Sequence, residues 1–442
     1  MRRLGGALLN LAVILALAAA LAVWIATPWV GAFGALVLLG AWMLLTRRGR
    51  QAASVTAIGL GTLRDRLGSA AVVVVGIAGV VGVLVALLAM GEGYRDTLRR
   101  TGDTDTAIVM RGGSDSEVTS LLEHDAVVAI SQAKGIMVDA AGKPMASPEL
   151  VVAANLPVAG GAPDDVGSVQ LRGVGEEAFA VRPNVRIVAG RRFRPGLHEL
   201  IVGRGAQREF AGLDVGRQIE LGSQPWRVVG IFASDDALES ELWADANVVA
   251  NIYRRGESRA SVTVRLKNPQ SFDAFKAALM TDPRLQVDVS TTLAYFSRQS
   301  ASTAKIIRVV GITVGAIMAI GAVFGALNCM FAAISARARE IATLRAIGFR
   351  GLPVVVGVLV ETMLLAFAGG VVGGAIAWLI FNGYTASTLA AGAVGQLSFS
   401  FRVTPALLWG GLKWALAIGL VGGAFPAVRA ARLPVAVALR EL

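Results

Sequence analysis

The chain alternates long apolar runs with shorter charged stretches, and this pattern predicts its fold class. Crossing a bilayer as a helix takes about 20 apolar residues. We place six such transmembrane helices near residues 7–26, 29–45, 71–90, 307–333, 354–381 and 405–425. The apolar content of 55%, against 17% charged residues, agrees with an integral membrane protein. The sequence therefore predicts a polytopic α-helical membrane protein, with a large domain inserted between spans 3 and 4.

The inserted stretch, residues 92–305, has the mixed patterning of an α+β domain. Runs typical of strands lie at 106–110, 150–154, 168–171, 199–202, 218–221, 226–232, 261–266 and 286–289. Helical spacing of apolar residues occurs at 117–133 and 271–281, and Ser271 is placed to cap the second helix. At this length the domain can bury its own core. It must do so without disulfides, because Cys329 is the only cysteine.

The basic residues predict how the spans are oriented. The net charge is +11, and the excess of arginine over acidic residues lies beside the span ends on one side of the membrane: Arg2, Arg3, Arg47, Arg48, Arg50, Arg64, Arg66, Arg337, Arg339, Arg345, Arg350, Arg429, Arg432 and Arg440. By the positive-inside rule both termini are cytoplasmic and the inserted domain is extracytoplasmic. This placement accounts for the net charge and excludes nucleic acid as a partner.

The start of the chain allows two interpretations. Arg2 and Arg3 precede an apolar run that ends in small residues, as in a cleaved signal peptide. However, a second apolar run follows directly, and Arg47, Arg48 and Arg50 come after it. An uncleaved transmembrane hairpin over residues 1–50, with both ends in the cytoplasm, is the simpler interpretation.

Residues 337–350 form a charged amphipathic segment between two spans. Ala338, Ile341, Leu344 and Ile347 recur at three-residue steps and would fill one arc of a helix, and the charged residues Arg337, Arg339, Glu340 and Arg345 occupy other directions. Gly348 stands where such a helix would end. The segment could lie on the bilayer surface, as basic cytoplasmic loops often do. The alternative is an element that couples the spans to a cytoplasmic partner.

No part of the chain has the pattern of a catalytic or metal site. His124 and His198 have no ligand-like neighbours at motif spacing, and no lysine lies in a phosphate-binding loop. The sequence therefore predicts no ATPase site of its own, no cofactor and no metal. The acidic run of Asp235, Asp236, Glu239 and Glu241 is expected to be a solvated loop rather than a partner-binding surface.

Polar residues and glycines within the spans point to helix packing. Asn328 and Glu361 lie inside predicted spans, where a polar group needs a partner. We expect an interhelical hydrogen bond from Asn328. For Glu361 we expect an ion pair with the nearby basic segment in preference to proton transport. Glycines four residues apart allow close helix contact, and we expect packing rather than a substrate path at these pairs: Gly311 and Gly315, Gly321 and Gly325, Gly369 and Gly373, Gly370 and Gly374, Gly419 and Gly423.

Several stretches in order resemble a known family. They are "MGEGYRDTL" after the third span, "ELIVGRGAQREF" and "VGRQIELGSQPWRVVGIF" in the inserted domain, "LNCMFAAISARAREIATLRAIGF" with "LVETMLLAFAGGVVGG", and the closing "FPAVRAARLPVAVALRE". On these motifs the chain resembles the FtsX/MacB-type permeases of ATP-binding-cassette transporters over residues 55–442. It departs from the family's four-span core in the additional hairpin, and from the usual glycine after Arg-Glu-Ile in Ala342.

The resemblance implies a domain organisation and a set of partners. Residues 51–91 would be a cytoplasmic amphipathic helix and span 3, residues 92–305 a MacB-like periplasmic core, and residues 306–442 an FtsX-like permease domain. Arg339, Glu340, Ile341, Leu344, Arg345, Ala346 and Gly348 would form a coupling helix on a separate ATP-binding subunit, which would hold the ATP. Two permeases would pair in the inner membrane, among its lipids. Residues 291–310 would be a stalk that moves the outer domain.

The resemblance leaves the function open within one class. The chain would be a permease subunit, not an enzyme, that couples ATP hydrolysis to motions which extrude or extract a substrate. An efflux system would add a periplasmic adaptor protein. Release of lipoproteins, and mechanotransmission that regulates cell-wall hydrolases, are the alternatives. From a different class, the outer domain could be a membrane-tethered enzyme or sensor, although six glycine-rich spans exceed what an anchor needs.

Overall fold

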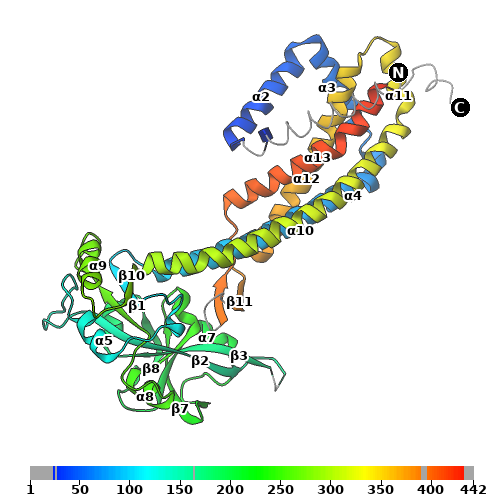
Figure 1. The fold of residues 1–442 in the computed structure, drawn as a ribbon. Coiled ribbons are helices and arrows are strands. Elements are labelled where there is room, and N and C mark those ends of the chain that lie inside the picture. The colour runs from blue at the N-terminus through cyan, green and yellow to red at the C-terminus, as the bar shows by residue number, and fades with distance from the viewer. Residues whose placement is uncertain (1–22, 25–26, 163–164, 390–395, 433–442) are drawn as a thin grey trace, which may run out of the picture. The chain divides into compact units, whose positions relative to one another are not determined.

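The protein is described by a computed structural model over residues 23–24, 27–162, 165–389 and 396–432. The chain divides into two compact units, and Figure 1 shows their elements along the chain. The helical unit holds residues 1–89, 307–382 and 402–442, and the α+β unit holds residues 90–306 and 383–401. Two long helices, α4 and α10, contain residues of both units.

The helical unit contains the apolar helices that the hydropathy pattern predicts. Its elements are α2 (Trp29–Leu45), α3 (Arg47–Gly61), η1 (Arg64–Arg66), α4 (Leu67–Thr101), α10 (Thr292–Ala336), α11 (Ala338–Ala346), α12 (Gly351–Phe381) and α13 (Pro405–Arg432). Among the described residues, α4, α10, α12 and α13 are each long and apolar enough to cross a membrane. The predicted spans 71–90, 307–333, 354–381 and 405–425 lie within them.

The N-terminal hairpin is described only in part. Predicted span 7–26 lies outside the described residues, apart from Val23 and Trp24. The next predicted span, 29–45, coincides with α2, which meets α3 at a bend of 102°. Gly49 permits this bend, because a Cβ there would collide with the backbone of Trp42. If α2 and α3 count as one broken span, the described residues hold up to five candidate spans.

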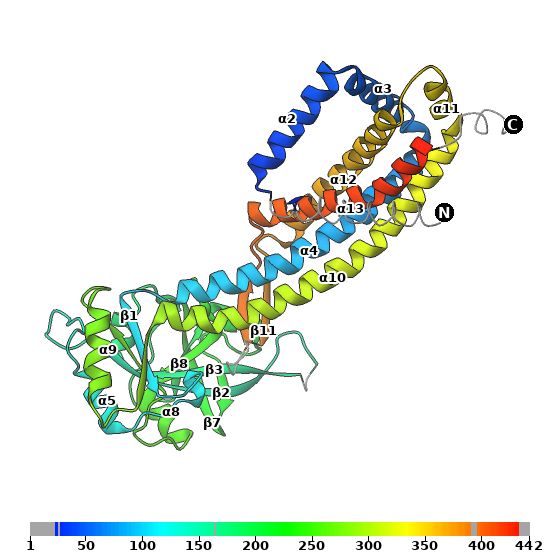
Figure 2. The same ribbon diagram turned by 45° about the horizontal axis from the view of Figure 1, so that its top comes forward.

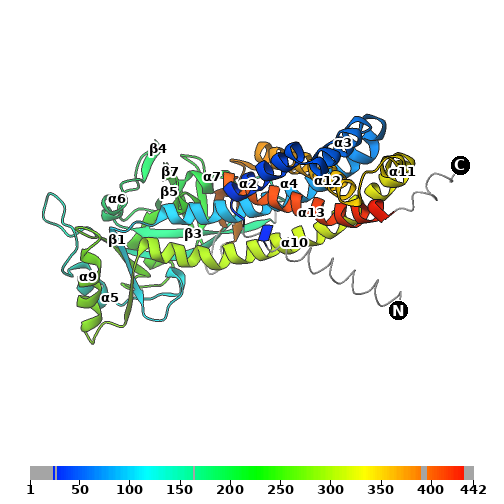
Figure 3. The same cartoon turned by 90° about the horizontal axis from the view of Figure 1, so that it is seen from above.

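Glycines bring the helices of this unit into contact. Gly311 and Gly315 of α10 face Leu87 and Leu84 of α4. Figure 2 shows α4 and α10 side by side, and Figure 3 shows α13 alongside α12. The other predicted pairs that pack are Gly369 and Gly373 against α4, Gly370 and Gly374 against α13, and Gly419 and Gly423 against α12.

One glycine pair of α10 differs from the others. A Cβ at either Gly321 or Gly325 would meet nothing within 4 Å. Within the described part of the subunit, no helix therefore packs closely on this pair.

The α+β unit is built on one long mixed sheet. Its strands are β1 (Thr106–Arg111), β2 (Ala146–Pro157), β3 (Val166–Val174), β4 (Arg186–Gly190), β5 (Glu199–Gly203), β6 (Gln218–Leu221), β7 (Gln224–Ala233), β8 (Glu241–Asp245), β9 (Ser261–Arg265) and β10 (Val287–Thr291). They lie in the order β10-β1-β9-β2-β3-β8-β5-β7-β4, with β6 paired to β7. A separate hairpin joins β11 (Thr385–Leu389) to β12 (Gln396–Ser400).

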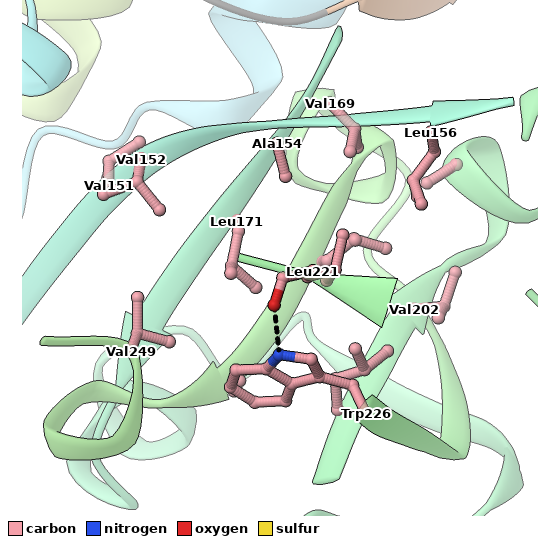
Figure 4. Close-up of a cluster of buried hydrophobic side chains, with 14 of the residues drawn as sticks. Val151, Val152, Ala154, Leu156, Val169, Leu171, Val202, Leu221, Trp226 and Val249 are labelled. Carbon is pink, nitrogen blue, oxygen red and sulfur yellow. Dashed lines mark hydrogen bonds between the residues drawn. The ribbon is translucent and has the colours of Figure 1, made fainter. Parts of the chain in front are cut away.

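Strand β2 divides the unit into two lobes. Its residues 146–149 pair with β9, and residues 150–157 pair with β3. The β9 lobe packs α5 (His124–Ser131) and α9 (Ser271–Thr281) around Ile130 and Phe275. The β3 lobe buries a cluster around Trp226, whose indole donates to the Leu221 carbonyl at 3.2 Å (Figure 4). The remaining short helices are η2 (Glu117–Thr119), α6 (Glu177–Val181), α7 (Arg204–Glu209), η3 (Ala237–Ser240) and α8 (Ala246–Ile252).

Two local predictions for this unit were wrong. Residues 117–133 are not one helix: η2 and α5 are separated by Leu122, which pairs with Arg259 as an isolated bridge. Ser271 is the first residue of α9 and not its cap, and its N–H donates to the Asn268 side chain at 2.9 Å. Strands β4 and β8, and the β11–β12 hairpin, were not predicted at all.

Candidate functional site

The segment singled out by the sequence is a short helix with defined ends. Arg337 leaves helical geometry (φ −106°, ψ 10°), so α10 ends and α11 begins at Ala338. At the other end Gly348 has φ +104°, a conformation that favours glycine, and its N–H bonds the Arg345 carbonyl at 3.2 Å. The Phe349 N–H bonds the Leu344 carbonyl at 3.1 Å. The predicted helix and its stop at Gly348 are confirmed.

The burial along α11 follows the predicted apolar arc only in part. Ile341 and Ala342 are buried, and Ala338, Leu344 and Arg345 are half-buried. Ile341 packs in a cluster with Met330, Ile334, Val354, Val358, Ala427 and Ala430, and Figure 2 shows α11 beside the end of α13. Ile347, which the spacing placed on the same arc as Ile341, is 70% exposed. Arg337, which the spacing grouped with the charged residues, is 8% exposed.

The exposed face of α11 is therefore a narrow arc that carries charged, polar and apolar side chains. Arg339, Glu340, Thr343, Ala346 and Ile347 are exposed, and they fall within about one third of the helix circumference at 100° per residue. Of the predicted coupling residues, Arg339, Glu340, Ala346 and Gly348 are on the exposed side, and Ile341 is not. This face presents one large aliphatic side chain, Ile347, beside the charged Arg339 and Glu340.

A buried ion cluster holds the beginning of α11 against its neighbours. Glu361, about three turns into α12, accepts from Arg66 at 2.7 Å and from Arg337 at 3.2 Å. Arg337 also donates to Glu340 at 3.1 Å. Glu361 is 3% exposed. The expected ion pair between Glu361 and the basic segment is present, and nothing in the sequence pointed to its second partner, Arg66.

Helix α3 closes over this cluster. Gly59 lies so close to it that a Cβ would collide with a carboxylate oxygen of Glu361 and lie 3.2 Å from Arg337. A Cβ added at Gly357 of α12 would likewise lie only 2.6 Å from the Val55 side chain of α3. Helix α3, the short helix η1, the beginning of α11 and α12 thus meet at one carboxylate. A displacement of α11 has a direct path to each of these helices.

Asn328 lies on an unpartnered face of α10. It is exposed, together with Ile306, Val310, Ile317, Gly321 and Phe324, and this spacing aligns them along one side of the helix. The described structure shows no hydrogen bond from the Asn328 side chain. The expected interhelical bond is therefore not made among the described residues of one subunit and stays a prediction.

Comparisons with known proteins place the chain in a family. A family model described as the MacB-like periplasmic core domain matches residues 70–281, and one described as the FtsX-like permease C-terminal domain matches residues 312–435. Together they cover more than half of the chain. The chain belongs to the FtsX/MacB-like permease family. The first match ends with α9, and the second begins within α10.

The names of relatives of this permease include ATP binding as well as a permease. The macrolide export ATP-binding/permease protein MacB of Escherichia coli is 23% identical over 418 residues, which are 90% of this chain and 62% of that protein. The protein of the same name from Photorhabdus laumondii is 28% identical over 296 residues, 63% of this chain and 44% of that protein. The permease therefore spans less than two thirds of the length of these relatives.

One solved structure is similar over part of the chain. The periplasmic region of MacB from Actinobacillus actinomycetemcomitans aligns with 44% of this permease and 91% of that chain, at 15% identity and a TM-score of 0.33. At this TM-score the family assignment rests on the two family models alone.

The acidic run in the α+β unit is solvated only in part, with Asp235 exposed and Glu239 half-buried. Asp236 and Glu241 are buried, and Glu241 accepts two hydrogen bonds from Arg172, at 2.7 and 2.8 Å. The prediction of a solvated loop was wrong for these two carboxylates, and the arginine partner of Glu241 is distant in sequence. Arg172 lies on β3 and Glu241 on β8, and the parallel pairing of these two strands brings them together.

Arg172 is the centre of a wholly buried charge cluster. It is 1% exposed and also donates to Glu117 at 2.8 Å and Glu149 at 2.7 Å. Arg182 donates to Glu149 as well, and Ser261 to Glu117. Burial alone would lower the pKa of Arg172, but the charges of Glu117 and Glu241 raise it well above its usual value. The cluster joins both lobes of the domain, because β2, β3, β8 and β9 all contribute to it.

Asp236 caps η3 at the edge of this cluster. Its carboxylate accepts from the Leu238 N–H at 2.9 Å, the Ser234 hydroxyl at 2.6 Å and the Asn184 amide at 2.8 Å. Burial raises its pKa to about 6, against the lowering effect of these hydrogen bonds. Residues 234–241 are thus a packed junction.

The two histidines take no part in a site. His124 is exposed and lies 3.5 Å from Glu257, and His198 packs against the Trp226 ring. Within the described part of the chain, no group of three His, Cys, Asp or Glu is arranged to hold a metal ion.

Proposed function

We propose that this chain is the membrane subunit of an ABC transporter in which α11 receives force from a separate ATP-binding subunit. The family assignment supports the class of protein, and the exposed arc of Arg339, Glu340, Thr343, Ala346 and Ile347 supports the contact surface. Ile341, Leu344, Arg345 and Gly348 position this surface. Because Arg337 and Glu361 tie α11 to α12, movement of α11 on ATP binding would displace the spans.

The proposed topology follows the charge pattern. Six spans would cross the inner membrane with both termini in the cytoplasm, and the α+β unit would be extracytoplasmic, inserted between spans 3 and 4. The basic ends of the spans would face anionic lipid headgroups of the cytoplasmic leaflet. Motions of the spans would reach the outer domain through α4 and α10 and would act there on a substrate, by extrusion or extraction.

We also propose that two permeases pair through α10. The evidence is Asn328 in line with Ile317, Gly321 and Phe324, beside a glycine pair that no described helix of the same subunit packs against. Small residues allow close approach of two helices, and a polar side chain in hydrocarbon gains about 0.6 to 2 kcal/mol from an interhelical hydrogen bond. A second copy would supply this partner.

Purification from native membranes tests the contact surface. The wild type is expected to retain an ATP-binding subunit and to stimulate its ATP hydrolysis. The exchange Ile347→Asp, and separately Arg339→Ala with Glu340→Ala, should lower recovery by about tenfold, since a central contact residue contributes about 1 to 2 kcal/mol. The matched control is Val188→Asp, which places the same charge at an exposed valine of β4.

The same purification distinguishes the alternatives. If no ATP-binding subunit is recovered with the wild type, or if Ile347→Asp recovers as much as the control, the coupling proposal is wrong. Two differently tagged copies should co-purify, and less so with Asn328→Leu, if the permease pairs through α10. An adaptor protein among the recovered partners would favour export, as the names of the relatives suggest. A cell-wall hydrolase or a lipoprotein would favour the regulatory or release function.

A further inference from the structure

The β11–β12 hairpin lies within the part of the sequence predicted to be the permease domain. It follows α12 directly and leads directly into α13, yet residues 383–401 belong to the compact α+β unit. Its strands are paired over five residue positions, from Thr385 with Ser400 to Leu389 with Gln396. The C-terminal pair of spans therefore carries, between its two members, a piece of the extracytoplasmic domain.

The hairpin is bound to the rest of that domain by specific contacts. The Ser398 N–H donates to the Ser240 hydroxyl of η3 at 2.9 Å, and the Ser398 hydroxyl donates to Glu209 of α7 at 2.9 Å. Leu397 and Phe399 are 6% and 2% exposed. They pack in a cluster with Tyr94, Leu98 and Ala237, and the rings of Tyr94 and Phe399 meet edge to face at 5.6 Å.

Two glycines show how closely the hairpin packs against α4 and α7. A Cβ at Gly93 of α4 would collide with the Ser400 carbonyl, so the backbones of α4 and β12 are in direct contact. A Cβ at Gly205 would lie 3.4 Å from the Ser398 Cβ. The hairpin is therefore seated as tightly as a core strand, and its contacts involve both backbone and side chains.

The hairpin and the end of α4 converge on the same short helix. The N–H of Ala237, the first residue of η3, donates to the Thr101 hydroxyl of α4 at 3.0 Å. At the last residue of η3, Ser240 holds the hairpin. Asp236 fixes the backbone between them by capping η3, and Glu241 then enters the Arg172 cluster. The end of α4 and the hairpin thus both contact η3, which lies next to the Arg172 cluster that joins the two lobes.

We propose that the β11–β12 hairpin is a second mechanical connection, through which displacement of α12 and α13 reaches η3 independently of the α4–α10 stalk. This inference rests on the proposed function, because the displacement originates at α11 and passes to α12 through Glu361. In this proposal the hairpin stays bound to the α+β unit throughout the ATP hydrolysis cycle and pulls on η3. A force on η3 then acts on the buried Arg172 cluster, because Glu241 follows η3 directly in the chain.

Undocking the hairpin tests this connection in the full-length permease with its co-purified ATP-binding subunit. The variant Ser398→Ala with Phe399→Ala removes both the hydrogen bond to Glu209 and the buried ring. The control is Ser387→Ala, at the exposed serine paired with Ser398 across the hairpin. The readout is deuterium uptake with and without a non-hydrolysable ATP analogue. The ATP-dependent difference in residues 234–241 should be smaller in the variant than in the wild type, because only the Thr101 contact of α4 still reaches η3, and it should be unchanged in the control.

A disulfide supplies the complementary test. Gly205→Cys with Ser398→Cys, on a Cys329→Ser background, places the two Cβ atoms near the ~3.5 to 4.5 Å of natural disulfides. The new side chain at position 205 must also shift slightly from the Glu239 carbonyl, which lies 2.9 Å from the ideal Cβ. The oxidised protein should keep its ATP-dependent uptake difference, and the reduced protein controls for the substitutions. Loss of the response only on oxidation would mean that the hairpin must detach, which overturns the proposal.

These outcomes distinguish the hairpin connection from the function on which it rests. If the ATP analogue changes uptake nowhere in the wild type, the proposed function fails. If the wild type and the Ser398→Ala with Phe399→Ala variant respond equally, while both retain the ATP-binding subunit, only the hairpin connection fails.

Discussion

Replacing Arg172 with methionine is expected to unfold the α+β unit. The substitution leaves Glu117, Glu149 and Glu241 buried around an apolar side chain, and only Glu149 keeps an arginine partner, Arg182. Removing one member of a buried ion cluster costs about 3 to 5 kcal/mol. With three carboxylates affected, this is comparable to the ~5 to 15 kcal/mol that stabilises a whole domain.

Limited proteolysis of the full-length protein in detergent measures this effect, because cleavage within residues 92–305 reports opening of the domain. The control is Arg265→Met, which breaks a half-exposed ion pair with Asp105 and should cost about 1 kcal/mol or less. Adding Glu117→Gln and Glu241→Gln to Arg172→Met should restore part of the protection, since it removes two of the uncompensated charges. Wild-type resistance of Arg172→Met would refute the structural role of the cluster.

The second large effect is expected at Glu361. The exchange Glu361→Gln keeps the shape of the side chain but leaves Arg66 without its carboxylate partner and Arg337 with Glu340 alone. The loss of charged hydrogen bonds of this kind is about 2 kcal/mol, or a roughly 30-fold shift in the ratio of docked to undocked α11. ATP hydrolysis by the partner should continue while its effect on the extracytoplasmic domain is lost.

Deuterium uptake in residues 338–346 measures the docking of α11, and the nucleotide-dependent change in the outer domain measures the coupling. Glu92→Gln is the matched control, because Glu92 forms only an exposed contact with Arg95 at 3.9 Å. Unchanged uptake in α11, with normal coupling, would show that Glu361 fills space and does not hold the coupling helix.

The features that could be predicted are those that local pattern determines. Runs of apolar residues predicted α2, α4, α10, α12 and α13, and the spacing in residues 337–350 predicted α11 with its stop at Gly348. Glu361 was predicted to pair with the basic segment because a carboxylate within a span needs a nearby cation. The burial of Arg337 was not predicted, because its neighbours Glu361 and Gly59 lie on other helices.

The features that could not be predicted depend on contacts distant in sequence. Glu241 has the appearance of a loop residue until β3 brings Arg172 beside it, 69 positions away. The run Glu241–Asp245 was therefore not predicted as strand β8, although all its residues are buried. The packing of the hairpin at residues 383–401 on η3 and α4 was not predicted, because nothing within the hairpin identifies these partners. One signal was available: alternating apolar residues from Leu397 to Phe401 after a glycine-rich stretch are typical of a strand.

If events at α11 move the extracytoplasmic domain, a distance measurement between two permeases detects that movement most directly. Met280 of α9 is 61% exposed, so a spin label at Met280→Cys on a Cys329→Ser background would report the separation of the outer domains in the paired complex. We expect a non-hydrolysable ATP analogue to shift this distance in the complex with the ATP-binding subunit, and we expect no shift when Ile347→Asp is added. An unchanged distance in the complex without Ile347→Asp, or the same shift in both, would contradict the coupling of α11 to the outer domain.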